Sequence, residues 1–425
     1  MLKDEGRSYE AIPRRQVQGL IVLLRELFLR ETSSADDSME KYGRAFNHPE
    51  HLVFFKGSAG TIEALNHFKE IAEEKEGATS IRRKWDGNPQ VYWGREEKGG
   101  PLILAGHNQW SKGVKSTSPD SVYDFIANQS GNPKTPEEVK ARQQFATNFS
   151  NLYPLFDAAT PKDFVGFVYA DSLFGVDPAL DKKFDKPTNE YPAGIWSFAP
   201  NPKSKTTYHV DGASELGKRV AQAKVMVVGH ATFPRFGAGD REQQPMDDFS
   251  MFNQTPGLIV QGPIYTSAAP DIDTSSVDNM IEYVTEHGPA IDNFLGSLPD
   301  PDKNGILYPF FNQMSNLHAA GKQDFGSING ASFINWMTQK GISAKKQQHI
   351  INMIQEHPGG LDAIFFLIKG IRNMKDLVDA AIKQQPRTEI WDSDGEGHVR
   401  YPQKQHKYGP IKIVPTTWAP GALTA

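Results

Sequence analysis

The chain has 425 residues, a formal net charge of −5, 38% hydrophobic residues and 23% charged residues, which is the composition of an ordinary globular protein. Its length allows two domains or one domain with a large insertion, and its acidic balance argues against nonspecific coating of nucleic acid. The lack of cysteine excludes disulfides, thiolate catalysis and cysteine-ligated metals. Because no apolar run is long enough to span a bilayer and the N-terminus shows no secretory signal, we expect a cytoplasmic protein without membrane contact.

The predicted elements begin with helices. Residues 16–31 and 61–75 place apolar side chains at intervals of three and four, which is typical of amphipathic helices. Gly77 stands where it would end the second helix. Alternating, β-branched and aromatic segments then predict strands. These strands cover residues 80–83, 91–93, 102–105, 164–169, 206–210, 225–228 and 257–264.

The pattern changes to successive helices between about residues 275 and 385, with proline and glycine between them. The predicted helices cover residues 277–286, 290–295, 331–340, 344–356, 361–371 and 374–383. Strand character returns after Pro386. We therefore predict an α+β fold with an N-terminal helical arm (residues 1–55), an α+β domain (residues 56–270 and 386–425) and a helical insertion (residues 271–385).

Three short segments stand out for their chemistry. Lys84-Trp85-Asp86-Gly87 lies at a break between two predicted strands. Far downstream, Glu396, Gly397 and Val399 form an E-G-x-V segment, and Lys412 is the centre of an Ile-Lys-Ile strand. A lysine two residues before Asp-Gly, followed by an acid and a second lysine on later strands, indicates a site that acts on the phosphates of a nucleotide.

The roles of these residues follow from phosphoryl chemistry. A lysine amine attacks phosphorus only when neutral, whereas an ordinary lysine has a pKa of about 10.4. Nearby cations favour the neutral amine, and Arg83 is such a cation, as is Lys412 if the strands meet. Lys412 would also balance charge on the equatorial oxygens of the transition state. Glu396 would bind Mg²⁺ directly or through water.

The glycines and Asp86 complete this candidate site. Gly87 and Gly397 allow the backbone to approach a nucleotide closely, and Asp86 would orient the lysine or a sugar hydroxyl. Each motif also has a plain alternative. Lys84 can be a turn lysine, Glu396 and Gly397 a solvated loop pair, and Lys412 an outward residue of an edge strand.

The three segments together resemble the lysine-adenylate nucleotidyltransferase superfamily, which comprises ATP-dependent DNA ligases, RNA ligases and mRNA capping enzymes. Its motifs K-x-D/H/N-G, E-G-x-V and a following lysine match residues 84–87, residues 396–399 and Lys412 in identity and order. Within the superfamily the chain most resembles a group of tailed-phage proteins with a KWDG motif. The resemblance implies an adenylation domain of largely antiparallel sheets flanked by helices, with ATP and Mg²⁺ as cofactors.

The chain departs from the family pattern in its third motif, where the family carries an acid on a strand. Phe167 stands at that place. Asp171 follows four residues later, which puts it on the same face of a strand. It is the candidate replacement for contact with the ribose or the metal. Asn88 is a possible polar replacement for an arginine of the family. Lys112 lies where the family has a second sugar- or phosphate-contacting segment, or in an ordinary loop.

The region after Lys412 distinguishes the family's branches. Only 13 residues follow it, so we expect no C-terminal OB domain, as in several RNA ligases. The resemblance therefore implies an ATP-dependent polynucleotide ligase, of RNA-ligase type rather than a DNA ligase, that joins 5′-phosphate and 3′-hydroxyl ends through a lysyl-AMP intermediate. The helical insertion would contact nucleic acid or a protein partner, in the cytoplasm of an infected host. The alternative is a non-catalytic phage structural or nucleic-acid-binding protein on the same fold.

Overall fold

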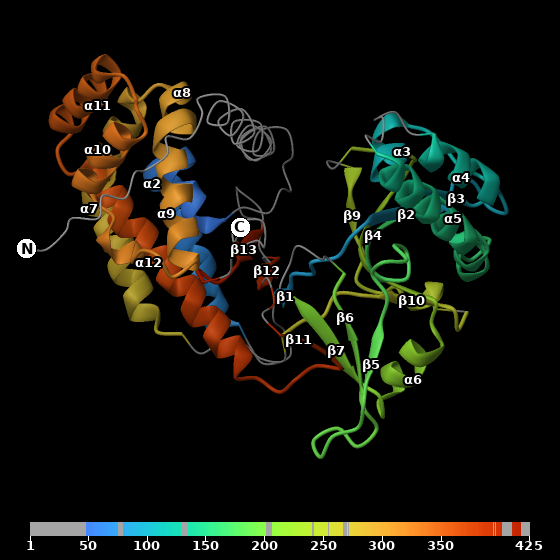
Figure 1. Cartoon of the computed structure of the whole chain (residues 1–425). Helices are drawn as coiled ribbons and strands as arrows, with labels where there is room; N and C mark the ends of the chain where they lie inside the picture. The colour runs from blue at the N-terminus through green and yellow to red at the C-terminus, as the bar shows by residue number, and fades with distance from the viewer. Residues whose placement is uncertain are drawn as a thin grey trace, which may run out of the picture. The chain divides into compact units, whose positions relative to one another are not determined.

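The computed structural model describes residues 48–74, 80–128, 135–200, 206–239, 242–253, 255–266, 270, 272–393, 395, 397–401 and 410–417. The predicted helix at residues 16–31 and the predicted site residue Glu396 lie outside this description. The described chain combines helices with antiparallel and mixed sheets, so the predicted α+β class is confirmed (Figure 1). No helix of the described part has the length and apolar character that a membrane crossing requires.

The largest sheet has the strand order β10-β8-β4-β2-β3, with β9 paired to β8. Only the pairing of β10 with β8 is parallel. The strands are β2 (Gln90–Arg95), β3 (Ile103–Gly106), β4 (Gly166–Phe174), β8 (Val225–Phe233), β9 (Gln244–Pro245) and β10 (Leu258–Gln261). β2, β3, β4, β8 and β10 were predicted because their β-branched and aromatic residues fit a half-buried pleated surface.

The two faces of this sheet bury different cores. On one face, α4 (Pro119–Ala127) and α5 (Pro136–Ala159) pack on a cluster that includes Trp93, Phe149 and Phe156. On the other face, Tyr92, Trp110, Phe167, Phe233 and Phe236 form an aromatic cluster beside α3 (His107–Lys112). None of these three helices was predicted. The first half of α5 is polar and exposed, and Pro154 lies inside it, so its local pattern is weak until the sheet provides a surface to cover.

A second antiparallel sheet has the order β11-β7-β6-β5. Its strands are β5 (Lys183–Asp185), β6 (Ile195–Phe198), β7 (Thr207–Asp211) and β11 (Ile390–Ser393), with α6 (Glu215–Gln222) nearby. Tyr208, Val210 and Leu216 belong to the core that this sheet shares with Trp85 and Met226. This core therefore joins the second sheet to β8 and to the segment that follows β1.

The helical part consists of α2 (Pro49–Glu73), α7 (Thr274–Ser297), α8 (Asp300–Asp302), α9 (Tyr308–Ala319), α10 (Gly330–Gln339), α11 (Ala344–Glu356) and α12 (Gly360–Lys383). Short turns η2 (Ser250–Phe252), η3 (Lys303–Leu307) and η4 (Phe325–Ser327) complete the described elements. α2 packs against both α7 and α12, so a segment from before the first strand lies among the later helices (Figure 1).

Two breaks predicted between helices do not occur. α7 continues through Pro289, and α12 is one helix where two were expected. Proline removes one hydrogen bond from a helix interior. In α7, Val284, Gly288 and Ile291 are buried around Pro289, and contact with α2 stabilises the continuous helix. Tertiary packing thus overrides the local break signal.

A three-stranded antiparallel sheet links the two ends of the described chain. It has the order β1 (Ile81–Arg83), β12 (His398–Arg400) and β13 (Ile411–Ile413). Ile411 and Ile413 are fully buried, and β13 contacts both α2 and α12. The sheet therefore places Val399 and Lys412 in one unit with the strand that precedes Lys84.

Candidate functional site

Lys84 and Lys412 lie in the same small sheet. Arg82 pairs with Val399, which pairs with Lys412, so these three residues face the same side. The backbone N–H of Lys84 donates to the carbonyl of Gly397 at 2.9 Å, which extends the pairing by one residue beyond β1. Because side chains alternate along a strand, Lys84 falls on the face that carries Lys412.

The charges of both motif lysines also affect the pKa of His48. His48 immediately precedes α2, and burial, followed by the charges of Lys375, His51, Lys412 and Lys84, holds its pKa well below the usual range. Both motif lysines therefore act on one imidazole. Sequence reasoning missed His48, because no local pattern connects the start of α2 with strands so far away in the chain.

Gly397 occupies a position that only glycine fits. Its φ is +116°, a region that side chains disfavour. A Cβ added there would lie 2.4 Å from the carbonyl oxygen of Ile413 on β13. The close approach of β12 and β13 between Lys84 and Lys412 therefore requires glycine. The neighbouring Glu396 lies outside the described residues.

The segment after Lys84 is held firmly by the second sheet. Trp85 is buried and packs on the ring of Tyr208 with centroids 5.0 Å apart. The backbone N–H of Asp86 donates to the Tyr208 hydroxyl at 2.8 Å. Gly87 lies so close to β4 that an added Cβ would be 2.5 Å from the Cβ of Asp171. Tyr208, which sequence reasoning also missed, is thus the anchor of this loop.

Asp171 lies on the same face of β4 as Phe167, as predicted, because Gln90 and Gly94 of β2 pair with them in register. Its Oδ2 contacts Nε2 of His230 at 2.9 Å. Its Oδ1 is buried and has no hydrogen-bond partner among the described residues. Phe167 is fully buried in the aromatic cluster, which leaves Asp171 as the acid beside Gly87. The described residues contain no group of three or more potential metal ligands.

A cavity of about 460 Å³ opens beside this loop. Gly87, Asn88 and Asp171 line it together with the start of α3 at His107 and Asn108. Its other wall is formed by α4 and α5, with the side chains of Phe125, Ile126, Arg142, Phe145 and Phe149. An apolar wall with a few polar groups opposite is typical of a site for a small organic ligand.

Two predicted residues lie elsewhere. Lys112 is exposed at the last position of α3, whose first residues line the cavity. Arg83 precedes Lys84 and so faces the opposite side of the sheet. Its guanidinium pairs with Asp392 at 3.1 Å and donates to the carbonyl of Ile390 at 2.6 Å. These contacts tie β1 to β11.

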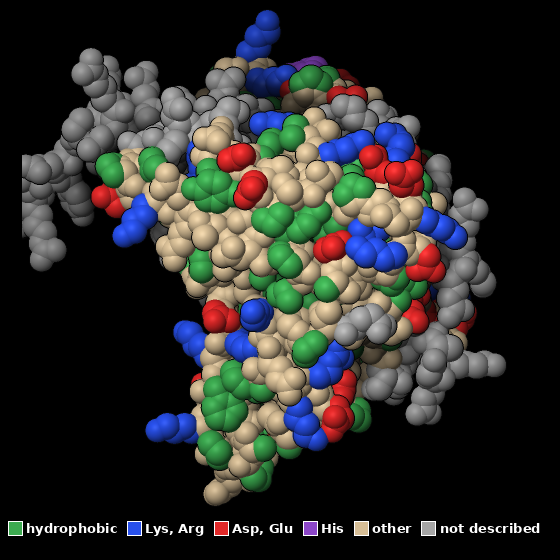
Figure 2. Space-filling model, turned by 90° about the vertical axis from the view of Figure 1, so that its right-hand side faces the viewer, with side chains coloured by type: hydrophobic (Ala, Val, Ile, Leu, Met, Phe, Trp, Pro, Cys, Tyr) green, Lys and Arg blue, Asp and Glu red, His purple; other side chains and the backbone are tan. Residues whose placement is uncertain are grey.

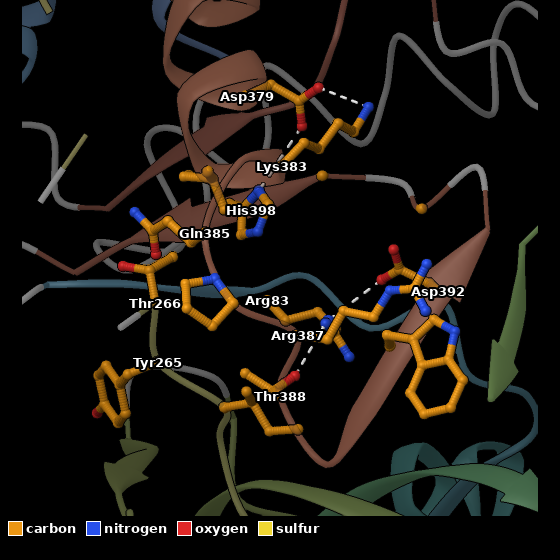
Figure 3. A pocket seen from close by; sticks show the side chains of 16 residues that line it. Arg83, Tyr265, Thr266, Asp379, Lys383, Gln385, Arg387, Thr388, Asp392 and His398 are labelled. Atoms are coloured by element: carbon orange, nitrogen blue, oxygen red, sulfur yellow. Dashed lines mark hydrogen bonds and ion pairs between the residues drawn. The ribbon is translucent and has the colours of Figure 1, made fainter. Parts of the chain in front are cut away.

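Arg83 lines a second cavity of about 290 Å³, shown in Figure 3. Asp379 and Lys383 of α12 form its upper wall, and His398 of β12 points toward Asp379. Gly397 also lines this cavity, so its backbone borders both Lys84 and the second cavity.

His398 provides a prediction on pH. Burial, with the charges of Arg83 and Lys383, lowers its pKa to about 3. In the unfolded chain the imidazole binds its proton near pH 6.5, so lowering the pH from 7 to 4 favours the unfolded chain. We expect the free energy of unfolding, measured by urea titration, to fall over this range. The fall should be smaller in His398→Gln, and an equal fall in both proteins would contradict the assignment.

Charge on the surface is mixed. On the face that looks to the right in Figure 1, basic and acidic side chains are interspersed (Figure 2), in keeping with the small net charge of −5. Attraction for a phosphate backbone must therefore come from local groups.

No protein-family model, no curated protein and no solved structure matches the chain.

Proposed function

We propose that this protein is an ATP-dependent polynucleotide ligase of RNA-ligase type, with a nucleotidyltransferase fold and a covalent lysyl-AMP intermediate on Lys84. The supporting observation is the sheet β1-β12-β13, which joins Lys84 to Gly397 through a hydrogen bond and carries Lys412 on the same face. The pairing joins strands from opposite ends of the described chain.

In the first step the neutral amine of Lys84 attacks the α-phosphorus of ATP. A nitrogen–phosphorus bond forms, the nitrogen loses a proton to solvent, the bond to the bridging oxygen breaks, and pyrophosphate leaves. Lys412 supplies positive charge on the side of the sheet where phosphate oxygens gain charge in the transition state. The AMP then passes to a 5′-phosphate, and a 3′-hydroxyl displaces it to form the phosphodiester.

The 460 Å³ cavity supports a place for the nucleoside. Its lining begins at Gly87, three residues after the nucleophile. Because Gly87 has no side chain, its backbone lies directly beside Asp171. The aromatic wall from α4 and α5 suits a purine ring, and Asn88 and Asp171 suit its ribose. The backbone of Asp86 is held by the Tyr208 hydroxyl. This contact would fix the distance between Lys84 and the cavity.

The buried, unpartnered Oδ1 of Asp171 fits an ion that prefers oxygen ligands. Mg²⁺ keeps several waters and needs few protein ligands, so Asp171, with Glu396 as the second predicted ligand, would hold it. When bound, Mg²⁺ would neutralise charge on the leaving pyrophosphate.

Incubation with α-labelled ATP and Mg²⁺ tests the proposal. We expect one covalent label per chain that survives denaturation, is released by acid as expected for a phosphoramidate, and is removed by added pyrophosphate. GTP should label weakly. If pure protein stays unlabelled with both nucleotides over a range of pH and divalent metals, the ligase assignment is wrong.

Replacement of Lys412 by methionine should slow label formation roughly a hundredfold, because one donor to the transition-state charge is lost. Methionine keeps the unbranched side chain, so the half-buried position on β13 should tolerate it. Single-turnover labelling at saturating ATP measures the rate. An unchanged rate would show that Lys412 does not face the transferred phosphate.

A second candidate is a non-catalytic nucleotide- or nucleic-acid-binding protein on the same fold. The fully buried Phe167 at the family's acid position favours it. Nucleotide binding without covalent transfer would support this candidate, and detectable sealing of a nicked substrate would eliminate it.

A further inference from the structure

The second cavity, behind Lys84 on the opposite face of β1 and β12, has the features of another binding site. It holds about 290 Å³ and is lined by charged, polar and aromatic side chains from α12, β11 and the segment after β10. Gly397 borders it, and the Gly397 carbonyl accepts the N–H of Lys84. The cavity therefore adjoins the proposed nucleophile through the backbone of Gly397.

Most charged groups of the cavity are already paired. Arg83 contacts Asp392 at 3.1 Å, and its Nη2 donates to the Thr388 hydroxyl at 3.3 Å. Lys383 contacts Oδ2 of Asp379 at 2.7 Å (Figure 3). The charges of these two pairs therefore neutralise each other without a ligand.

Two polar atoms remain unmatched. Oδ1 of Asp379 and Nδ1 of His398 face each other at 3.8 Å, and each is buried without a hydrogen-bond partner among the described residues (Figure 3). Asp379 is only 5% exposed. A separation of 3.8 Å is too long for a hydrogen bond, and a buried polar atom without a partner is costly. An oxygen lying to one side of both atoms would supply the missing hydrogen bonds.

A hydroxyl group has the right chemistry for this position. Its hydrogen donates to the carboxylate, and its oxygen accepts from the imidazole when Nδ1 carries the proton. Since the two atoms are 3.8 Å apart, one oxygen can lie within hydrogen-bonding distance of both. Arg387, whose exposed guanidinium pairs with Glu190 at 3.1 Å, also lines the cavity, as do the rings of Trp391 and Tyr265, and these groups suit a phosphate and a base.

We propose that this cavity binds one ribonucleotide of an RNA strand, with its 2′-hydroxyl between Asp379 and His398. This inference rests on the proposed ligase function and identifies its polynucleotide substrate as RNA. The 2′-hydroxyl is the group by which a protein distinguishes RNA from DNA, and here it completes the hydrogen bonds of two buried side chains. Arg387 at the rim binds the adjoining phosphate.

Fluorescence anisotropy with the full-length protein tests the inference. The probes are single-stranded RNA and DNA of one sequence, each with a 5′-phosphate. Wild type should bind RNA about tenfold more tightly, as expected for a hydrogen bond to a charged group. Asp379→Asn and His398→Phe should lower RNA affinity to the DNA value and leave DNA affinity unchanged. Asp300→Asn is the matched control, an acid on α8 with its side chain 83% exposed, and should retain the preference.

A probe series on wild type removes any dependence on the stability of the variants. Single 2′-deoxy substitutions along the RNA should weaken binding at one position and leave the others unchanged. Equal affinities for RNA and DNA, a preference that persists in both variants, or a uniform loss along the strand would each overturn the inference.

The labelling reaction needs no RNA, so the two proposals fail separately. Covalent labelling with equal RNA and DNA affinities would overturn the RNA site alone. An RNA preference that depends on Asp379 and His398, without any labelling, would support the site and overturn the ligase.

Discussion

Replacement of Lys84 by alanine should abolish covalent labelling by α-labelled ATP. The nucleophile is removed, and alanine has no group that can attack phosphorus. The fold should persist, because Lys84 is half-buried and its structural contact to Gly397 uses the backbone N–H. Single-turnover labelling followed by electrophoresis measures the effect, which we expect to exceed a thousandfold, on the order of the loss when a catalytic nucleophile is removed.

Two further variants make this result specific. Lys84→Arg keeps the positive charge, but a guanidinium is never neutral near pH 7 and cannot attack, so it should also remain unlabelled. Lys218→Ala removes an exposed lysine that pairs with Glu215 on α6, and it should label as wild type does. Label retained in Lys84→Ala, or mapped to another peptide, would show that the nucleophile is a different residue.

Replacement of Arg400 by methionine should lower the free energy of unfolding by about 3–5 kcal/mol, the range seen when one partner of a buried ion pair is removed. Arg400 is 2% exposed on β12. Its guanidinium donates to Nδ1 of His67 at 2.6 Å and to the carboxylates of Glu70 and Glu74 at 2.9 and 3.3 Å. Its loss leaves the buried His67 and two partly buried carboxylates without that partner.

Urea denaturation followed by circular dichroism measures this effect. Arg235→Met is the matched control, because Arg235 is 63% exposed and pairs with Glu242 at the surface, and such pairs contribute at most about 1 kcal/mol. Since Arg400 ties β12 to α2, we also expect weaker labelling by ATP in Arg400→Met. A loss of stability no larger than that of the control would show that the β12–α2 contact contributes little.

Much of the β-structure could be predicted from local pattern. The strands around Val91, Val168 and Val225 alternate or run apolar in the way that a packed sheet requires, and each was found. The helices α4 and α5 were missed, because their apolar residues become buried only when they pack against that sheet. The division of α12 was predicted wrongly for a related reason: local helix signals cannot show how a long helix packs on α2 and α7.

The candidate site divides in the same way. Lys84, Asp171 and Lys412 were predicted as site residues from residue type and spacing, which can be read along the chain before any contact is known. The pairing of β1, β12 and β13, the contact of Tyr208 with the loop, and the effect of both lysine charges on the pKa of His48 became known only from the fold. Such contacts arise from burial of surfaces that are distant in the chain, and no local pattern encodes them.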